Sequence, residues 1–197
     1  MGERKSSLER ETTETSIKLA INLDGGGRAN ISTGIGFFDH MLQQIARHGL
    51  IDLDIEARGD LQVDFHHTVE DVGILLGQAI AEALGDKAGI VRYASAFIPM
   101  DEALAMLVVD LSGRPFLHYD VKFNGETTGN FEVQLVEEFF RALAFNAGMT
   151  LHINCLYGRN NHHIIEGIFK AFAKVLDRAT SFDTRIRGVM STKGRLE

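Results

Sequence analysis

The 197-residue sequence has a single cysteine, no long apolar run and no proline- or glycine-rich linker. Cys155 cannot form an internal disulfide, which is typical of a reducing compartment, and we therefore expect a cytoplasmic protein. No stretch approaches the roughly 20 apolar residues needed to cross a bilayer, and the polar start does not resemble a signal peptide. The missing linker favours one domain over two independent ones.

Basic residues are also in short supply, because the formal net charge is −7. A nucleic-acid surface needs clustered lysine and arginine, so this balance argues against nucleic-acid binding. A small anionic substrate in a local basic pocket remains compatible with it. With 45% hydrophobic and 24% charged residues, the chain is long enough to bury a sizeable core.

The pattern H-H-x-x-E is present twice, at His66-His67-Thr68-Val69-Glu70 and at His162-His163-Ile164-Ile165-Glu166. On a helix, the glutamate lies one turn beyond both histidines, so that a carboxylate and an imidazole share a face. Adjacent helical residues point about 100° apart, so two neighbouring histidines are unsuited to binding the same ion. The repeated pattern therefore predicts two metal ions, of a type such as Mn, Fe, Zn or Ni.

Hydrophobic periodicity predicts an α+β protein made of two fused β-β-α-β-α pseudo-repeats, about 10–95 and 100–186, with a C-terminal tail at 187–197. We expect one sheet of about eight strands with the helices packed on one face. The expected first-half elements are a β-hairpin of 15–23 and 28–32, a helix from 37 to 48, a strand at 50–57, and a helix from about 67 to 84. The expected second-half elements are a strand at 103–111 paired with 116–123, a helix from 133 to 143, a strand at 149–156, and a helix at 162–179.

Superposing the halves with an offset of 98 places the segment from His48 to Ile55 over the segment from Asn146 to Ile153. The same offset places His40 over Glu138, so each half has a further candidate metal ligand on its first helix. Gly73 and Gly77 lie one turn apart in the helix that begins near the first H-H-x-x-E. Glycine is costly within a helix, and this spacing suggests close approach of another backbone.

The chain resembles the imidazoleglycerol-phosphate dehydratase family in five motifs that occur in order over nearly its whole length. These motifs are Gly34-Ile35-Gly36-Phe37-Phe38-Asp39-His40-Met41-Leu42, Asp64-Phe65-His66-His67-Thr68-Val69-Glu70-Asp71, Asp110-Leu111-Ser112-Gly113-Arg114-Pro115-Phe116, Asn161-His162-His163-Ile164-Ile165-Glu166 and Ser191-Thr192-Lys193-Gly194. The resemblance implies a ribosomal S5 domain 2-like fold and the dehydration of imidazole glycerol phosphate to imidazole acetol phosphate in histidine biosynthesis. It further implies a route through an imidazolate bridging two metal ions and a diazafulvene-like intermediate.

The resemblance also implies two Mn²⁺ ions per active site and a homo-oligomer of about 24 chains built of trimers. It assigns His40, His66, Glu70 and His162 to one Mn. It assigns His67, His163, Glu166 and the residue at position 138, here Glu138, to the other. In many relatives position 138 is a histidine, and a carboxylate is a competent replacement as a ligand of Mn.

The remaining implied roles concern the substrate. Arg92, Arg114, Ser191 and Lys193 match the phosphate-binding positions of the family, and Glu14 matches a glutamate that handles protons at the substrate. Asp101 and Glu102 are candidates for groups that support the metal ligands from behind.

Two other functions fit parts of the sequence. A dinuclear metal-dependent phosphohydrolase also combines His and carboxylate ligands with phosphate-binding arginines. The chain lacks both the H-E-x-x-H pattern and an aspartate cluster of the phosphatase type. A non-catalytic metal-storage shell would explain the repeated ligands, but it gives no purpose to Arg92, Arg114 and Lys193.

Overall fold

The structure is a computed structural model that describes residues 4–196. Its strands are β1 (Lys5–Glu11), β2 (Thr15–Asn22), β3 (Ala29–Ser32), β4 (Asp52–Gly59), β5 (Tyr93–Met100), β6 (Ala103–Asp110), β7 (Phe116–Asp120), β8 (Thr127–Thr128), β9 (Phe131–Glu132) and β10 (Thr150–Tyr157). Its helices are α1 (Gly36–Gly49), α2 (His66–Leu84), α3 (Leu135–Ala147) and α4 (Asn161–Thr180). The expected α+β class is confirmed.

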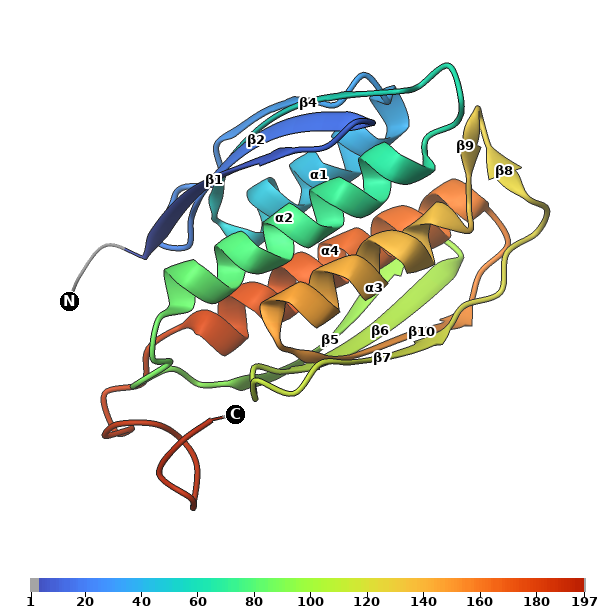
Figure 1. The fold of residues 1–197 in the computed structure, drawn as a ribbon. Helices are drawn as coiled ribbons and strands as arrows, with labels where there is room; N and C mark the ends of the chain where they lie inside the picture. The colour runs from blue at the N-terminus through green and yellow to red at the C-terminus, as the bar shows by residue number, and fades with distance from the viewer. Residues whose placement is uncertain (1–3, 197) are drawn as a thin grey trace.

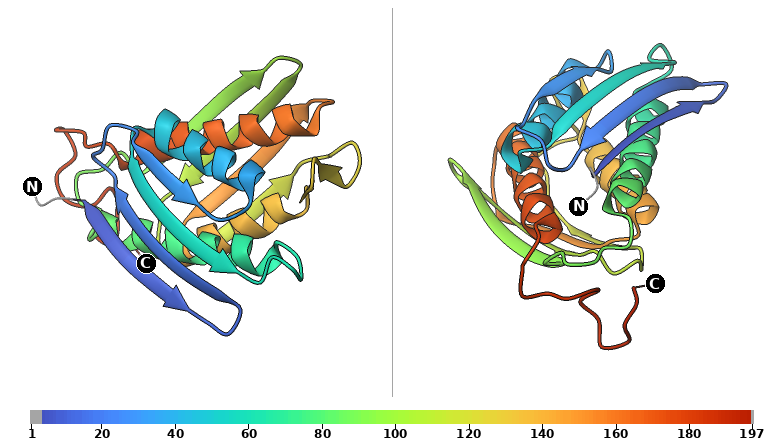
Figure 2. Two further views of the ribbon diagram at one scale, coloured as in Figure 1. Left: turned by 90° about the horizontal axis from the view of Figure 1, so that it is seen from above. Right: turned by 90° about the vertical axis from the view of Figure 1, so that its left-hand side faces the viewer.

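The helices lie between two four-stranded sheets (Figures 1 and 2). The sheets have the orders β1-β2-β4-β3 and β5-β6-β10-β7, and β8 and β9 form a separate short pair. Along the central strands every second residue is buried toward the helices, as in β2, where Ile17, Leu19 and Ile21 are buried. No helix within residues 4–196 has the length and apolar character to span a membrane.

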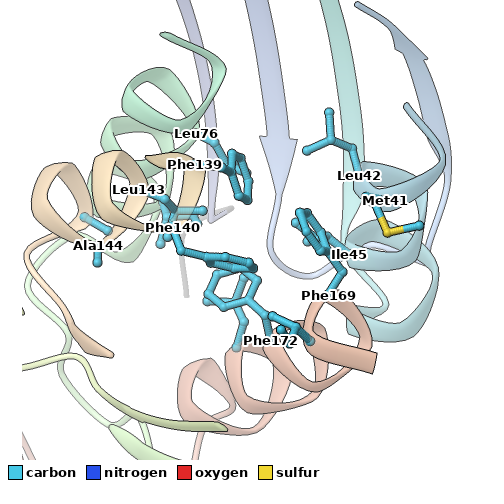
Figure 3. Close-up of a cluster of buried hydrophobic side chains, with 14 of the residues drawn as sticks. Met41, Leu42, Ile45, Leu76, Phe139, Phe140, Leu143, Ala144, Phe169 and Phe172 are labelled. Carbon is cyan, nitrogen blue, oxygen red and sulfur yellow. The ribbon is translucent and has the colours of Figure 1, made fainter. Parts of the chain in front are cut away.

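The core between the helices is rich in phenylalanine (Figure 3). Phe139 and Phe140 from α3 pack against Phe169 and Phe172 from α4, with ring centroids 5.0–5.4 Å apart. All four rings are fully buried. Because α3 and α4 bury side chains toward both a sheet and the other helices, they form a middle layer rather than an outer one.

The internal repeat is confirmed by strand order and by register. Strands β1, β2, β4 and β3 of the first sheet occupy the same positions as β5, β6, β10 and β7 of the second. In the two central strand pairs, Leu19 lies opposite Ile55 and its counterpart Leu107 lies opposite Ile153. The duplicated unit is βββαβα, since β1 and β5 each add a strand at an edge. Strands β1 and β5 are absent from the elements expected from the sequence.

The expected single sheet and two expected strand pairs are wrong. The eight main strands form two sheets that enclose the helices. Strand β3 pairs in parallel with β4 rather than forming a hairpin with β2, and β7 pairs in parallel with β10 rather than with β6. Burial explains the difference. The buried face of β4, with Leu53, Ile55 and Ala57, gains most from a central place, whereas the short and mostly exposed β3 tolerates the edge.

Candidate active site

Three candidate metal ligands meet where α1 and α4 begin. His40 is on α1, and His162 and Glu166 are one turn apart on α4. Glu166 Oε2 lies 3.0 Å from His162 Nε2 and 3.5 Å from His40 Nε2, and the three donor atoms lie within 4.8 Å of one another. Two imidazoles and a carboxylate that converge in this way can bind a divalent transition metal.

The second carboxylate oxygen of Glu166 is held by a lysine. Lys170, one turn further along α4, places its Nζ 2.6 Å from Glu166 Oε1. Burial raises the pKa of Glu166, but the hydrogen bonds from Lys170 and His162 outweigh it and leave the pKa below its ordinary value. The carboxylate is therefore kept ionised, as a metal ligand must be.

The counterparts of these three residues under the internal repeat, His66, Glu70 and Glu138, are less tightly gathered. On α2, His66 Nε2 lies 3.7 Å from Glu70 Oε2, and Glu138 is in the first turn of α3, the helix that packs against α2. Among residues 4–196, only His40, His162 and Glu166 form a group of three such donors within 4.8 Å. The structure thus places Glu138 on the appropriate neighbouring helix without showing it in contact with His66 and Glu70.

The second histidine of each pair points elsewhere. The rings of His66 and His67 are nearly perpendicular with centroids 6.1 Å apart, and those of His162 and His163 are 6.3 Å apart with a similar tilt. This agrees with the expectation that adjacent histidines bind different ions. The expected division of the ligands between two ions stays a prediction. Within one chain, helical spacing brings Glu166 to His162, and α1 adds His40.

His67 and His163 each contact carboxylates. His67 Nδ1 lies 3.0 Å from Asp60 Oδ2 and 3.7 Å from Glu14 Oε2. His163 Nδ1 lies 2.7 Å from Glu102 Oε2. The hydrogen bond that His67 donates to Asp60 raises the pKa of His67, and the one that His163 donates to Glu102 raises the pKa of His163.

Glu102 is further fixed by the backbone. Its Oε1 accepts hydrogen bonds from the N–H groups of Arg159 (3.1 Å) and Asn160 (2.7 Å). The His163 hydrogen bond, followed by these two, lowers the pKa of Glu102 to about 2. Asp101, also named in the sequence analysis, is more exposed and lies 3.8 Å from His163 Nε2.

The four candidate phosphate-binding residues gather at the far end of the molecule. They line one cavity of about 670 Å³ between β5, the turn after β6 and the C-terminal tail. Its lining residues are Arg92, Tyr93, Arg114, Met190, Ser191, Thr192, Lys193, Arg195 and Leu196. The lining includes four basic side chains and the hydroxyls of Ser191 and Thr192, and such a cavity is suited to a phosphate dianion.

Arg92 and Arg114 differ in how many of their guanidinium donors are already hydrogen-bonded within the chain. Arg92 is buried, with Nε and Nη2 donating to the Asp110 carboxylate (2.7 and 3.0 Å) and Nη1 donating to the Met190 carbonyl oxygen (2.6 Å). Arg114 has a 63% exposed side chain and lies 3.7 Å from Asp110. Arg92 thus anchors the C-terminal tail, and Arg114 has more capacity left for a ligand.

The metal donors and the cavity lie at opposite ends of α4. The Arg92 N–H donates to the carbonyl oxygen of Ala179 in the last turn of the helix, whereas His162 is in the first turn. At 1.5 Å rise per residue, the intervening stretch is about 25 Å long. One chain therefore does not bring its phosphate cavity to its own metal donors.

Sequence reasoning missed three residues that organise these sites. Asp60 follows a buried strand and precedes the first H-H-x-x-E, and this position is a usable signal. Lys170 follows Glu166 by four residues, which is the spacing of a helical ion pair. Asp110 links Arg92 to Arg114 through space, and the chain order does not indicate this.

Known proteins resemble this chain throughout its length. A family model described as Imidazoleglycerol-phosphate dehydratase matches residues 33–176. Proteins with that name from Alkaliphilus metalliredigens and Acetivibrio thermocellus are 70% and 63% identical, covering 95% and 98% of this chain and 96% and 100% of their own. The crystal structure of imidazoleglycerol-phosphate dehydratase from Staphylococcus aureus is 42% identical with a TM-score of 0.83, covering 91% of this chain and 99% of that one.

These matches confirm the resemblance drawn from the five motifs. They include the region that carries both H-H-x-x-E patterns, and the solved relative has the same arrangement of elements. The predicted hydro-lyase activity in histidine biosynthesis is confirmed with them. The chain belongs to the imidazoleglycerol-phosphate dehydratase family.

Proposed function

We propose that the enzyme uses two Mn²⁺ ions in each active site. One ion would be held by His40, His162 and Glu166, which already converge. The other would be held by the counterparts of these residues under the internal repeat, namely His66 and Glu70 of the first repeat and Glu138 of the second. Imidazole and carboxylate donors in these numbers suit Mn and leave positions open for further ligands. His67 and His163, on other faces of their helices, would complete these shells.

Each group of residues would then have its own role in the dehydration. Bound divalent ions would supply Lewis acidity that makes an imidazole N–H of the substrate more acidic. Glu14, half exposed beside His67, would take the proton from the carbon next to the departing hydroxyl. Loss of that proton and of hydroxide releases one water and leaves an enol, which becomes the ketone. Arg114, Lys193 and Ser191 would hold the phosphate throughout.

The separation of about 25 Å between the metal donors and the phosphate cavity is the observation that supports a shared active site. A substrate with an imidazole ring and a phosphate is too short to reach both within one chain. We infer that the cavity of one copy faces the metal donors of another. His67 and His163, which lie outside the group of His40, His162 and Glu166 and are partly exposed, are suited to the same role, as ligands supplied across an interface.

The outer faces of the two sheets support a homo-oligomer, for which we propose about 24 chains built of trimers. The outer face of the second sheet exposes Phe97 and Val108 from the middle of its strands, and Leu156 near the end of β10. The equivalent face of the first sheet carries charged side chains such as Lys18 and Glu56. Exposed apolar side chains on this face favour contact with another copy.

A biosynthetic enzyme with one half-buried thiol is also suited to the reducing cytoplasm.

Mixing two impaired variants, assayed at a substrate concentration below KM, tests the shared site. Arg114→Ala damages the phosphate cavity, and His162→Ala damages the metal donors. If each active site draws on two chains, co-assembled variants regain turnover, because some sites combine the intact cavity of one variant with the intact donors of the other. The control mixes each variant with itself under the same conditions. No recovery in verified mixed assemblies would show that one chain supplies both parts.

A further inference from the structure

The second histidine of each H-H-x-x-E pattern makes a hydrogen bond to a carboxylate through the same ring atom, Nδ1. Asp60 Oδ2 lies 3.0 Å from Nδ1 of His67, and Glu102 Oε2 lies 2.7 Å from Nδ1 of His163. In the first histidine of the second pattern the opposite ring atom is engaged, because Nε2 of His162 faces Glu166. The four histidines therefore differ in which ring nitrogen faces a carboxylate: Nε2 in the first histidine of each pattern, and Nδ1 in the second.

A carboxylate at Nδ1 determines what the other ring nitrogen can do. An ionised carboxylate only accepts hydrogen bonds, so in a neutral ring Nδ1 carries the proton. Nε2 then holds the free lone pair, which is the form that binds a metal ion. Both rings are partly exposed, with side-chain exposures of 35% for His67 and 25% for His163, so Nε2 can be reached from outside the chain.

The two repeats use different positions for this carboxylate. Strand β6 begins 88 residues after β2, and by that offset Glu102 is the counterpart of Glu14. Strand β10 begins 98 residues after β4, and by that offset the counterpart of Asp60 is Gly158. The second repeat thus uses Glu102 and has no side chain at 158. The first uses Asp60 and leaves Glu14 at 3.7 Å, outside hydrogen-bond distance.

The surroundings of the two carboxylates differ: Glu102 also accepts backbone hydrogen bonds, whereas Asp60 has one oxygen without a partner among residues 4–196. A side chain on Gly158 would collide with Ile164, at 2.6 Å, so no carboxylate fits there in the second repeat. Glu102 Oε1 is fixed by two backbone N–H groups, as described above. Asp60 Oδ1 is buried and has no hydrogen-bond partner within residues 4–196, so Asp60 makes its hydrogen bond to His67 through Oδ2 alone.

We propose that Asp60 and Glu102 are positioning residues that keep Nδ1 of His67 and His163 protonated and direct Nε2 outward as the metal-binding atom. In the first repeat, Asp60 takes the place that the repeat would give to Glu14, and this leaves the Glu14 carboxylate uncommitted for proton transfer. The inference rests on the proposed two-metal site for its purpose. Its structural content, the tautomer of two rings, is independent of any metal.

Solid-state nitrogen NMR of the ¹⁵N-histidine-labelled, metal-depleted protein reads the tautomer directly. Asp60 and Glu102 raise the pKa values of these two rings, so the pH is increased until the ¹⁵N shifts show that both rings are neutral. We expect the Nδ1–H form at His67 and His163, with signals assigned by replacing each ring in turn. The Nε2–H form at either ring of the unmodified protein would overturn the proposal for that ring, and no variant needs to fold for this result.

Substitutions at Asp60 and Glu102 distinguish positioning of the two histidine rings from a general structural role. Asp60→Ala should convert His67 alone to the Nε2–H form and weaken Mn²⁺ binding about 10- to 100-fold, and Glu102→Ala should do the same for His163 alone. Asp60→Asn should be nearly normal, because its amide oxygen can accept from Nδ1 while its nitrogen takes the place of the unpartnered Oδ1. Glu102→Gln should fail, because both oxygens of Glu102 accept hydrogen bonds and an amide has only one oxygen.

Glu56→Gln, on the outer face of β4 beside Arg58, is the matched control and should change neither tautomer nor affinity. Equal losses in Asp60→Asn and Asp60→Ala would overturn the proposal, since they would mean that charge rather than the accepted hydrogen bond matters. If the tautomers respond as expected but Mn²⁺ affinity does not, the positioning of the rings stands and the proposed two-metal function is the part that fails.

Discussion

Arg92 and Arg114 carry the same charge in the same cavity, yet their surroundings give them different roles. The guanidinium of Arg92 is already engaged by Asp110 and by the backbone of the C-terminal tail. Arg114 is exposed and only loosely paired with Asp110. A phosphate that enters the cavity therefore finds more free donors on Arg114, whereas Arg92 holds in place the tail that carries Ser191 and Lys193.

Arg114→Ala should raise KM for the phosphorylated substrate while leaving metal content unchanged. A charge-assisted hydrogen bond to phosphate contributes about 1.5–3 kcal/mol, which corresponds to about a tenfold effect or more. Steady-state kinetics and metal analysis of the same preparation check this. Loss of metal from the variant would mean that Arg114 supports the structure of the site instead.

Glu138 is the residue on which the repeat makes its sharpest prediction. It is the counterpart of His40, which contacts Glu166 across the α1–α4 interface. Glu138→Ala should release about one Mn²⁺ per chain and abolish turnover, whereas Glu138→His should retain both ions because imidazole replaces carboxylate at Mn. The neighbouring Glu137, paired with Arg141 on the surface of α3, provides the control variant Glu137→Ala. Full occupancy in Glu138→Ala would exclude this ligand.

At the scale of elements, α2 and α3 approach each other through two glycines. A Cβ atom on Gly73 would lie 2.7 Å from the carbonyl oxygen of Phe139, and one on Gly77 would lie 2.5 Å from that of Leu143. Both distances are shorter than atoms can tolerate, so the close approach expected from the glycine spacing is confirmed. It sets the distance between the helix that carries His66 and Glu70 and the helix that carries Glu138.

Gly77→Ala should therefore destabilise the fold by about 1–3 kcal/mol, because the added methyl forces two backbones apart. Denaturant unfolding measures the change. Gly36→Ala is the matched control, since a Cβ at Gly36, in the first turn of α1, meets nothing within 4 Å. If Gly77→Ala is as stable as the Gly36 control, α2 and α3 can separate at no cost and the glycines do not set their spacing.

At the scale of the whole molecule, metal binding and assembly should depend on each other. If His67 and His163 of one chain bind ions held by another, removing the ions removes contacts between chains. Treatment with a chelator should reduce the particle to smaller units, and added Mn²⁺ should restore it. Light scattering or sedimentation with and without chelator measures the size. A particle that keeps its size after verified metal removal would contradict shared ligands.

Local patterns in the sequence were sufficient for much of the fold. Every main helix was expected from 3.6-residue periodicity, and the central strands from alternation, because these signals depend only on residues close in the chain. The repeated H-H-x-x-E pattern predicted a chelating face on each of two helices for the same reason. The family also followed from motifs in linear order.

Only the tertiary structure decided which elements meet. The pairing of β3 with β4, the division into two sheets and the meeting of His40 with His162 and Glu166 all join residues far apart in sequence. Their partners are selected by how much apolar surface each arrangement buries, which no local window reports. The same holds for Asp60, whose contact with His67 exists because a strand end and a helix start are packed together.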